Sequence, residues 1–158
     1  MRVRADGTGL ETISDTGQIE TFSSFSPDGS HVAFIEWFPN AAGEAAANAE
    51  IITVDIETGQ RTRLTNNDNF DAYPYWGPSG EWIYYTRLRR QDDGRWNGEV
   101  YRISPDAERS ERVTPEDETT DLRGIPTADE TSIVYNNGQD GSVWIMHAPI
   151  APETSTPE

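Results

Sequence analysis

Apolar and polar residues alternate in short runs along most of the chain, and Gly, Pro and Asp turns separate these runs. Such alternation is typical of half-buried β-strands. Three pairs of apolar positions show it most clearly: Val32 and Phe34, Ile83 and Tyr85, and Ile133 and Tyr135. No segment has a long apolar period of 3.6 residues, which an amphipathic helix would require. The alanine-rich run 41–50 is interpreted as a loop insertion, so the pattern predicts an all-β protein.

The pattern also repeats. The segment FSPDGSHVAF (25–34) aligns by its turn with WGPSGEWIYY (76–85) and PTADETSIVY (126–135), so that similar residues recur about every fifty positions. Downstream, Glu50–Thr65 matches Glu99–Thr114, and each reads as a strand, a polar turn and a short strand. Each unit is therefore predicted to contain four short strands. Asp-Gly and Asn-Gly pairs are expected to provide positive φ angles in turns at Gly29, Gly94, Gly98, Gly138 and Gly141.

Units of four antiparallel strands at this period indicate a β-propeller. A β-sandwich would explain the short strands but not an in-register repeat. We expect the aromatic residues before the turns, Phe25 and Trp76, to pack between neighbouring blades. The predicted blade boundaries are 1–14 (partial blade), 20–66, 70–115 and 120–148 (partial blade), with propeller repeats over 1–148 and a disordered tail at 149–158.

The repeats resemble those of TolB-type (WD40-like) β-propellers, which read Asn/Arg-Ala-Asp-Gly-x-Gly and then Trp-Ser-Pro-Asp-Gly before an apolar strand. MRVRADGTGLETIS (1–14) matches the first motif and FSPDGSHVAFI (25–35) the second, with Phe25 in place of Trp. In the second unit Gly77 and Ser79 replace the usual Ser and Asp. The resemblance implies the fold. It leaves function open, because relatives occur as periplasmic interaction proteins, as propeller domains of prolyl-oligopeptidase-type peptidases and as repeat proteins of unknown role.

The repeats amount to about three blades, whereas propellers usually have four to eight. Two explanations are open. In one, the chain forms a homodimer in which each end completes a blade of the partner. In the other, it is a fragment of a longer propeller. Met1 and the proline-rich tail are interpreted as natural chain ends, which favours self-association.

The chain is strongly acidic, with 28 Asp and Glu residues against 12 basic residues and a formal net charge of −16. Such a surface repels phosphate backbones and anionic membranes, so we expect neither nucleic-acid binding nor membrane insertion. A halophilic origin and an acidic secreted protein both explain the charge. No signal peptide is visible. The location stays open between the periplasm or exterior, by family analogy, and the cytoplasm of a halophile.

Candidate ligand-binding residues lie in the loops between blades, which gather at one end of a propeller. They are Asp15, Asp68, Asp71, Asp117 and Asp121. Such loops could form a negative funnel for cations or a basic peptide. The loop RLRRQDDGR (87–95) concentrates arginine, and its side chains could pair with carboxylates of a neighbouring subunit. The candidate interface residues are Arg87, Arg89, Arg90 and Arg95.

Catalysis has little support in the sequence. The only histidines are His31 and His147, there is no cysteine, and the Gly-x-Ser-x-Gly motif is absent. NNDNFD (66–71) lacks the spacing of an EF-hand and is interpreted as an Asx-rich turn. We therefore expect a non-enzymatic protein- or peptide-binding module with an acidic channel mouth, with no cofactor or metal. The alternatives are a substrate-gating or regulatory piece of a peptidase whose catalytic domain is on another chain, and a structural cation-binding protein.

Overall fold

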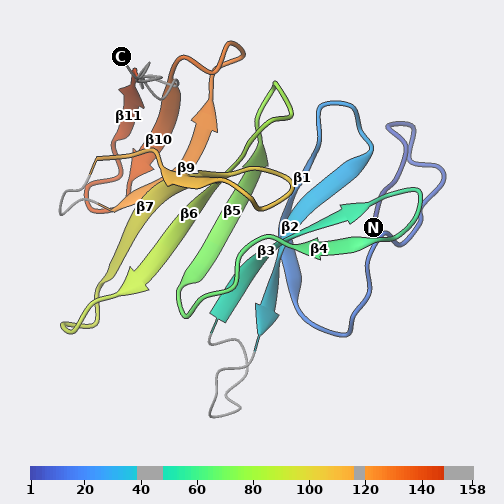
Figure 1. Ribbon diagram of the computed structural model, residues 1–158, viewed down its shortest axis with the longest axis horizontal. Coiled ribbons are helices and arrows are strands. Elements are labelled where there is room, and N and C mark those ends of the chain that lie inside the picture. The colour runs from blue at the N-terminus through green and yellow to red at the C-terminus, as the bar shows by residue number, and fades with distance from the viewer. Residues whose placement is uncertain (39–47, 116–119, 148–158) are drawn as a thin grey trace, which may run out of the picture.

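The computed structural model describes residues 1–38, 48–115 and 120–147. Within these residues every regular element is a β-strand, so the predicted all-β class is confirmed. The strands form three antiparallel units that follow one another across the molecule (Figure 1). Most of the insertion predicted at 41–50 and all of the tail predicted at 149–158 lie outside the described residues. Strand β3 begins at Asn48, inside the expected insertion.

Units one and two each contain four strands, and unit three contains three described strands. Unit one consists of β1 (Glu20–Phe25), β2 (His31–Phe38), β3 (Asn48–Asp55) and β4 (Arg61–Arg63). Unit two consists of β5 (Phe70–Trp76), β6 (Ile83–Arg90), β7 (Trp96–Ile103) and β8 (Ser110–Arg112). Unit three consists of β9 (Asp121–Pro126), β10 (Ile133–Asn137) and β11 (Val143–Met146).

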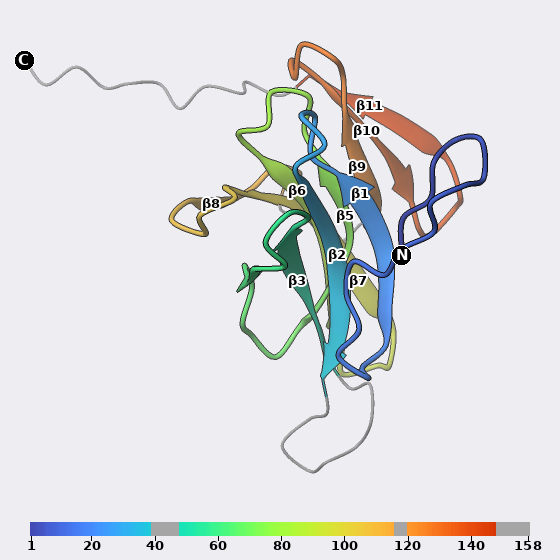
Figure 2. The ribbon, with the colours of Figure 1, turned by 90° about the vertical axis from the view of Figure 1, so that its right-hand side faces the viewer.

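Each unit is an up-and-down meander in which sequential strands pair antiparallel. The first strands of the units lie side by side, β1 next to β5 and β5 next to β9. In Figure 2 they lie together on one side, while β8 projects from the other. A single parallel bridge between Ala49 and Phe70 joins units one and two. The described residues do not close into a ring.

The core lies between the faces of successive units. Trp76 packs with Ala33 and Ile35 of unit one and with Ile83 and Tyr85 of its own unit. A second cluster between units two and three contains Tyr84, Val100, Ile133 and Tyr135. The residue pairs predicted to share a face thus point toward the preceding unit. Two faces buried against neighbours explain why these strands are apolar on both sides.

The prediction that Trp76 packs between two units is confirmed, but the same prediction for Phe25 is wrong. Phe25 is 55% exposed. The aromatic residue before the turn, such as Trp76 in unit two, packs against the preceding unit. Before unit one, the described segment 1–19 forms no regular strand; its backbone bonds include a bridge between Arg2 and Glu11 and one from the Trp37 N–H to the Ile19 carbonyl oxygen. Ile13 from this segment does pack on the outer face of unit one.

In units one and three, the turn between the first two strands is built from hydroxyl and carboxylate groups. In unit one, Ser26 and Ser30 donate hydrogen bonds to Asp28, and in unit three Thr127 and Thr131 do the same to Asp129. These bonds lower the pKa of Asp28 to about 2, with the Ser26 hydroxyl as the largest cause. The carboxylates therefore stabilise the turn in their charged form.

The turn of unit two is completed by unit three. Gly77 and Ser79 replace the hydroxyl and the carboxylate, and Glu130 of unit three enters the free space. Glu130 Oε1 accepts the Ser79 N–H at 2.7 Å, and Oε2 accepts the Tyr84 hydroxyl at 3.1 Å. A Cβ at Gly77 would lie 2.9 Å from Glu130 Oε1. The two departures from the repeat motif are thus compensated from the neighbouring unit.

Of the five glycines predicted at positive φ, Gly29, Gly94 and Gly141 have that conformation. The prediction is wrong for Gly98 and Gly138. Gly98 lies inside β7, where a Cβ would be 3.0 Å from the Asp121 carbonyl oxygen. This glycine is required by close approach between units two and three rather than by a turn.

Candidate functional site

The first or second residue of the first strand is acidic in every unit: Glu20 in β1, Asp71 in β5 and Asp121 in β9. The register places each of them opposite an equivalent residue of the second strand, which is Glu36, Arg87 or Asn137. Asp71 and Asp121 are buried. Two of the predicted ligand-binding residues are therefore part of the interior of the sheet rather than of an open loop.

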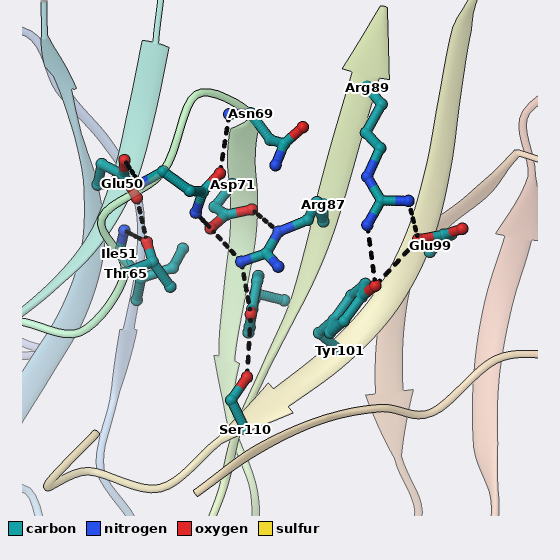
Figure 3. Close-up of polar contacts among 12 residues, drawn as sticks. Glu50, Ile51, Thr65, Asn69, Asp71, Arg87, Arg89, Glu99, Tyr101 and Ser110 are labelled. Atoms are coloured by element: carbon teal, nitrogen blue, oxygen red, sulfur yellow. Dashed lines mark hydrogen bonds and ion pairs between the residues drawn. The ribbon is translucent and has the colours of Figure 1, made fainter. Parts of the chain in front are cut away.

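Asp71 forms a two-pronged ion pair with Arg87 across β5 and β6. Arg87 Nε donates to Asp71 Oδ1 at 2.8 Å, and Nη2 donates to Oδ2 at 2.9 Å (Figure 3). Burial opposes the charge of Arg87, but the hydrogen bonds and charge of Asp71 outweigh it and raise the pKa of the guanidinium. Burial, followed by the charge of Asp71, raises the pKa of Tyr85 to about 12. Asp71 is thus neutralised within its own unit.

The loop between units one and two is fixed by the buried carboxylate of Glu50. Glu50 accepts the Thr65 hydroxyl at 2.5 Å and the Asn67 N–H at 2.7 Å. The Asn67 side chain accepts the N–H of Asn69 at 2.8 Å and donates to Asp71 at 2.8 Å. The segment is an Asx turn, as predicted, and its polar groups are satisfied by one another.

Three of the four candidate interface arginines pair with carboxylates of their own chain. Besides Arg87, Arg89 contacts Glu99 at 3.1 Å and the Tyr101 hydroxyl at 3.1 Å (Figure 3). Arg95 contacts Asp93 at 2.7 Å, and Arg90 is exposed. A role for these residues between subunits stays a prediction.

The predicted acidic residues do not form one cluster. Asp15 and Asp68 are exposed, Asp71 and Asp121 are buried, and Asp117 lies outside the described residues. No group of three or more His, Asp and Glu side chains in the described segments could hold a metal ion. A negative funnel therefore stays a prediction, and Asp71 is unsuited to it because Arg87 already neutralises its charge.

A row of strained residues runs along the first strands. Phe22, Tyr73 and Arg123 occupy equivalent positions at a bulge in β1, β5 and β9, and each has a φ between 54° and 57°. The Phe22 and Tyr73 rings are 4.7 Å apart, and the Arg123 guanidinium lies 4.7 Å from the Tyr73 ring centre. Left-handed backbone at residues other than glycine is costly, and recurring strain of this kind concentrates at functional sites. No sequence motif indicates this row.

Tyr73, the middle residue of that row, lines a groove of about 1030 Å³ between units two and three. The groove extends from Tyr73 to the turn between β6 and β7. Its apolar lining is Tyr73, Leu88, Trp96 and Leu122, and its polar lining includes Gln91, Asn97, Thr120 and Gln139. Trp96 is 49% exposed. Pockets that combine aromatic side chains with a few polar groups are typical of ligand sites.

The sequence predicted charged loop residues at this end, and the gathering of the inter-unit loops there stays a prediction. The groove is lined instead mainly by aromatic, aliphatic and amide side chains, and of the candidate residues that the structure describes only Arg95 reaches it. The only signal that could have indicated it is the difference between aligned repeats at Thr120 and Gly138. Elsewhere, His31 lies 3.7 Å from Asp55 and His147 contacts the Ser132 hydroxyl.

No family model matches the sequence. The chain is 32% identical over 65 residues to an uncharacterised protein of Agrobacterium fabrum, which covers 41% of this chain and 20% of that protein. Among solved structures, a putative TolB from Agrobacterium tumefaciens superposes with a TM-score of 0.60 at 19% identity, over 82% of this chain and 50% of that one.

The chain is structurally similar to TolB-type β-propeller domains. It also matches the tricorn protease with a TM-score of 0.57 at 17% identity, over 75% of this chain and 11% of that one. A prolyl endopeptidase structure matches with a TM-score of 0.57 at 16% identity, over 84% of this chain and 22% of that one. The resemblance to TolB-type repeats is thus confirmed for the fold. The chain spans half the length of the TolB structure and a fifth of the curated relative. The described residues include no helix long and apolar enough to cross a membrane.

Proposed function

We propose that this chain is a non-catalytic β-propeller module of about three blades that binds a protein or peptide segment at the end where its inter-unit loops gather. The observation that carries the proposal is the groove of about 1030 Å³ between units two and three. It lies beside the strained row on the first strands and combines exposed aromatic surface with amide and hydroxyl groups. Aromatic side chains with accessible faces are the usual anchors of protein recognition.

The proposal is tested by selecting a random peptide library on the full chain and measuring the affinity of the selected peptides by calorimetry. Trp96→Ala should weaken binding at least tenfold. Trp144→Ala is the matched control, because Trp144 of β11 is 48% exposed but does not line the groove. Equal affinities for both variants, or the absence of any selected peptide, would contradict the proposal.

A second candidate function is the gating of substrate for a peptidase whose catalytic part is on another chain. Fold similarity to the tricorn protease and to prolyl endopeptidases favours it. Mixing the purified chain with a candidate peptidase and comparing the cleavage of long and short peptides would test it. Gating predicts slower cleavage of the long peptide only, whereas a pure binding module predicts no change in either rate.

A further inference from the structure

Two positions of the repeat that hold large side chains in unit two hold small ones in unit three, beside the groove. In unit two, Phe70 and Leu88 face each other in the register of β5 and β6. In unit three the equivalent places hold Thr120 and Gly138, and the Gly138 N–H donates to the Thr120 carbonyl oxygen at 2.6 Å. The two positions correspond in backbone pairing, but their side chains are much smaller.

Phe70 shows what normally fills this space. Its ring packs edge-on against Trp37 of unit one, with ring centres 4.7 Å apart. The residue equivalent to Trp37 in unit two is Leu88, which lines the groove. Thr120 occupies the position in unit three that is equivalent to Phe70, so no aromatic ring extends from it. Thr120 and Gly138 therefore leave open a part of the groove that larger side chains would fill, and the groove as a whole is wider than one aromatic ring.

An asparagine at the start of the third strand also differs between the two junctions. Asn48 of unit one donates from its amide nitrogen to the Asn67 carbonyl oxygen at 2.6 Å, on the loop that leads to Phe70. Asn97, its equivalent in unit two, lines the groove, and Oδ1 of both residues is shielded from solvent without a hydrogen-bond partner. Among the described residues no hydrogen bond to the Asn97 amide is found. The amide nitrogen of Asn97 would donate to a main-chain carbonyl oxygen of a peptide in the groove, as that of Asn48 does to Asn67.

Charge in the groove favours an uncharged occupant. Its two charged lining residues, Asp93 and Arg95, form an ion pair at 2.7 Å with each other. An acidic or a basic side chain would have to compete with this pair, whereas an aromatic ring would face Leu88, Trp96 and Leu122. Aromatic pairs contribute favourably beyond the area that they bury.

We propose that the groove binds a peptide segment of a partner protein through one aromatic side chain, which takes the place that Phe70 has at the first junction. Asn97 hydrogen-bonds the main chain of that segment, as Asn48 does with the loop before Phe70. This inference rests on the proposed peptide-binding function and specifies the residue that the module recognises.

The test titrates the full chain with acetyl-Gly-Phe-Gly-amide and acetyl-Gly-Ala-Gly-amide by calorimetry. The Phe peptide should bind at least tenfold more tightly than the Ala peptide. Thr120→Phe, which restores the residue of the first junction, should weaken binding of the Phe peptide at least tenfold. Asn97→Leu, which keeps the size of the side chain but removes its amide, should weaken it about tenfold because a hydrogen bond is lost.

Circular dichroism and thermal unfolding establish that each variant is folded, and Gly138→Leu replaces Thr120→Phe if that variant is not. Trp144→Ala, outside the groove, should bind like the parent. If peptides from the library bind but Phe and Ala peptides bind equally, or if the groove-filling variants keep the parental affinity, the inference is overturned while the proposed function stands. If no peptide binds at concentrations on the order of millimolar, both are overturned.

Discussion

Units one and two solve the same electrostatic problem with arginines from different strands. In unit one, two carboxylates, Glu20 and Glu36, face each other across β1 and β2, and Arg61 of β4 contacts both. In unit two, Asp71 faces Arg87 directly. Ser110, at the position equivalent to Arg61, lies 3.5 Å from the Tyr85 hydroxyl.

The two units therefore share a balance of charge in the folded chain, although they do not share the residue type at each position. A buried carboxylate without a partner is costly, so an arginine must reach it from some strand. Because Arg87 of β6 pairs with the carboxylate in unit two, no arginine is required at Ser110 of β8. Alignment of the two units places Glu36 against Arg87 and Arg61 against Ser110. Either difference alone would upset the charge balance of the unit.

The largest loss of stability is expected when Arg87 of β6 is replaced by glutamate, the residue at the equivalent position of β2. Arg87→Glu should lower the free energy of unfolding by about 3–5 kcal/mol, because Asp71 would be left buried beside a second carboxylate. Adding Ser110→Arg supplies the arginine from β8, as in unit one, and should recover at least half of the loss. Urea denaturation at constant salt, followed by tryptophan fluorescence, measures both.

If the double variant is no more stable than Arg87→Glu alone, the two arrangements are not interchangeable. Arg87→Gln serves as the reference if Arg87→Glu does not fold. It leaves Asp71 unpaired without adding charge, and Ser110→Arg should stabilise it as well.

A second comparison concerns the turns, where Glu130 stands at the position that glycine holds in units one and two. Glu130→Gly should lower the free energy of unfolding by about 1–3 kcal/mol, because the Ser79 N–H and the Tyr84 hydroxyl lose their acceptor. Relief of the positive φ at this residue offsets only part of the loss. Adding Gly77→Ser and Ser79→Asp rebuilds the turn of unit one and should restore stability, as measured by urea denaturation. Glu130→Gln, which keeps one acceptor oxygen, should be milder than Glu130→Gly; an equal loss would argue against the hydrogen bonds as the cause.

Acid distinguishes the same two turns, because the turn of unit one contains its own carboxylate, Asp28, whereas the turn of unit two is bonded by Glu130 of unit three. The pKa of Asp28 is about 2 in the folded chain and about 4 when unfolded. Its contribution to stability is therefore complete above pH 4 and is lost as the pH falls toward 2. Asp28→Asn should flatten the decline of the melting temperature in this window, whereas Ser79→Ala should leave its slope as in the parent. A parental slope in Asp28→Asn would mean that other carboxylates dominate.

The smallest effect is expected at the turns between third and fourth strands. Gly59 of unit one has a φ of 73°, and Ala107 of unit two has a φ of 62°. Ala107→Gly should raise the free energy of unfolding by up to about 1 kcal/mol, since glycine adopts this conformation without strain. Gly59→Ala should lower it by a similar amount. Thermal unfolding measures both variants. If their melting temperatures shifted in the same direction, backbone strain would not explain the effects.

Much of the fold could be predicted from the sequence, because period 2 and the turn residues are local signals. Val32 and Phe34 mark a strand wherever it lies, and Asp28-Gly29 marks a turn by its own backbone chemistry. The candidate site was harder to predict. Asp71 reads as a loop carboxylate, but it is buried against Arg87, which is far from it in sequence. Trp96 gives no sign in the sequence that its face is left open.

The all-β class, the repeated antiparallel units and the TolB-type turns follow from the amino-acid sequence alone, since those features depend on alternation and turn residues within a few positions. The neutralisation of particular charges, the need for glycine at close approaches and the position of the groove are visible only in the folded chain. Those properties depend on what stands opposite a residue in the next unit. Whether Asp71 finds Arg87, or Thr120 leaves the space that Phe70 fills, is settled by packing between units rather than by local pattern.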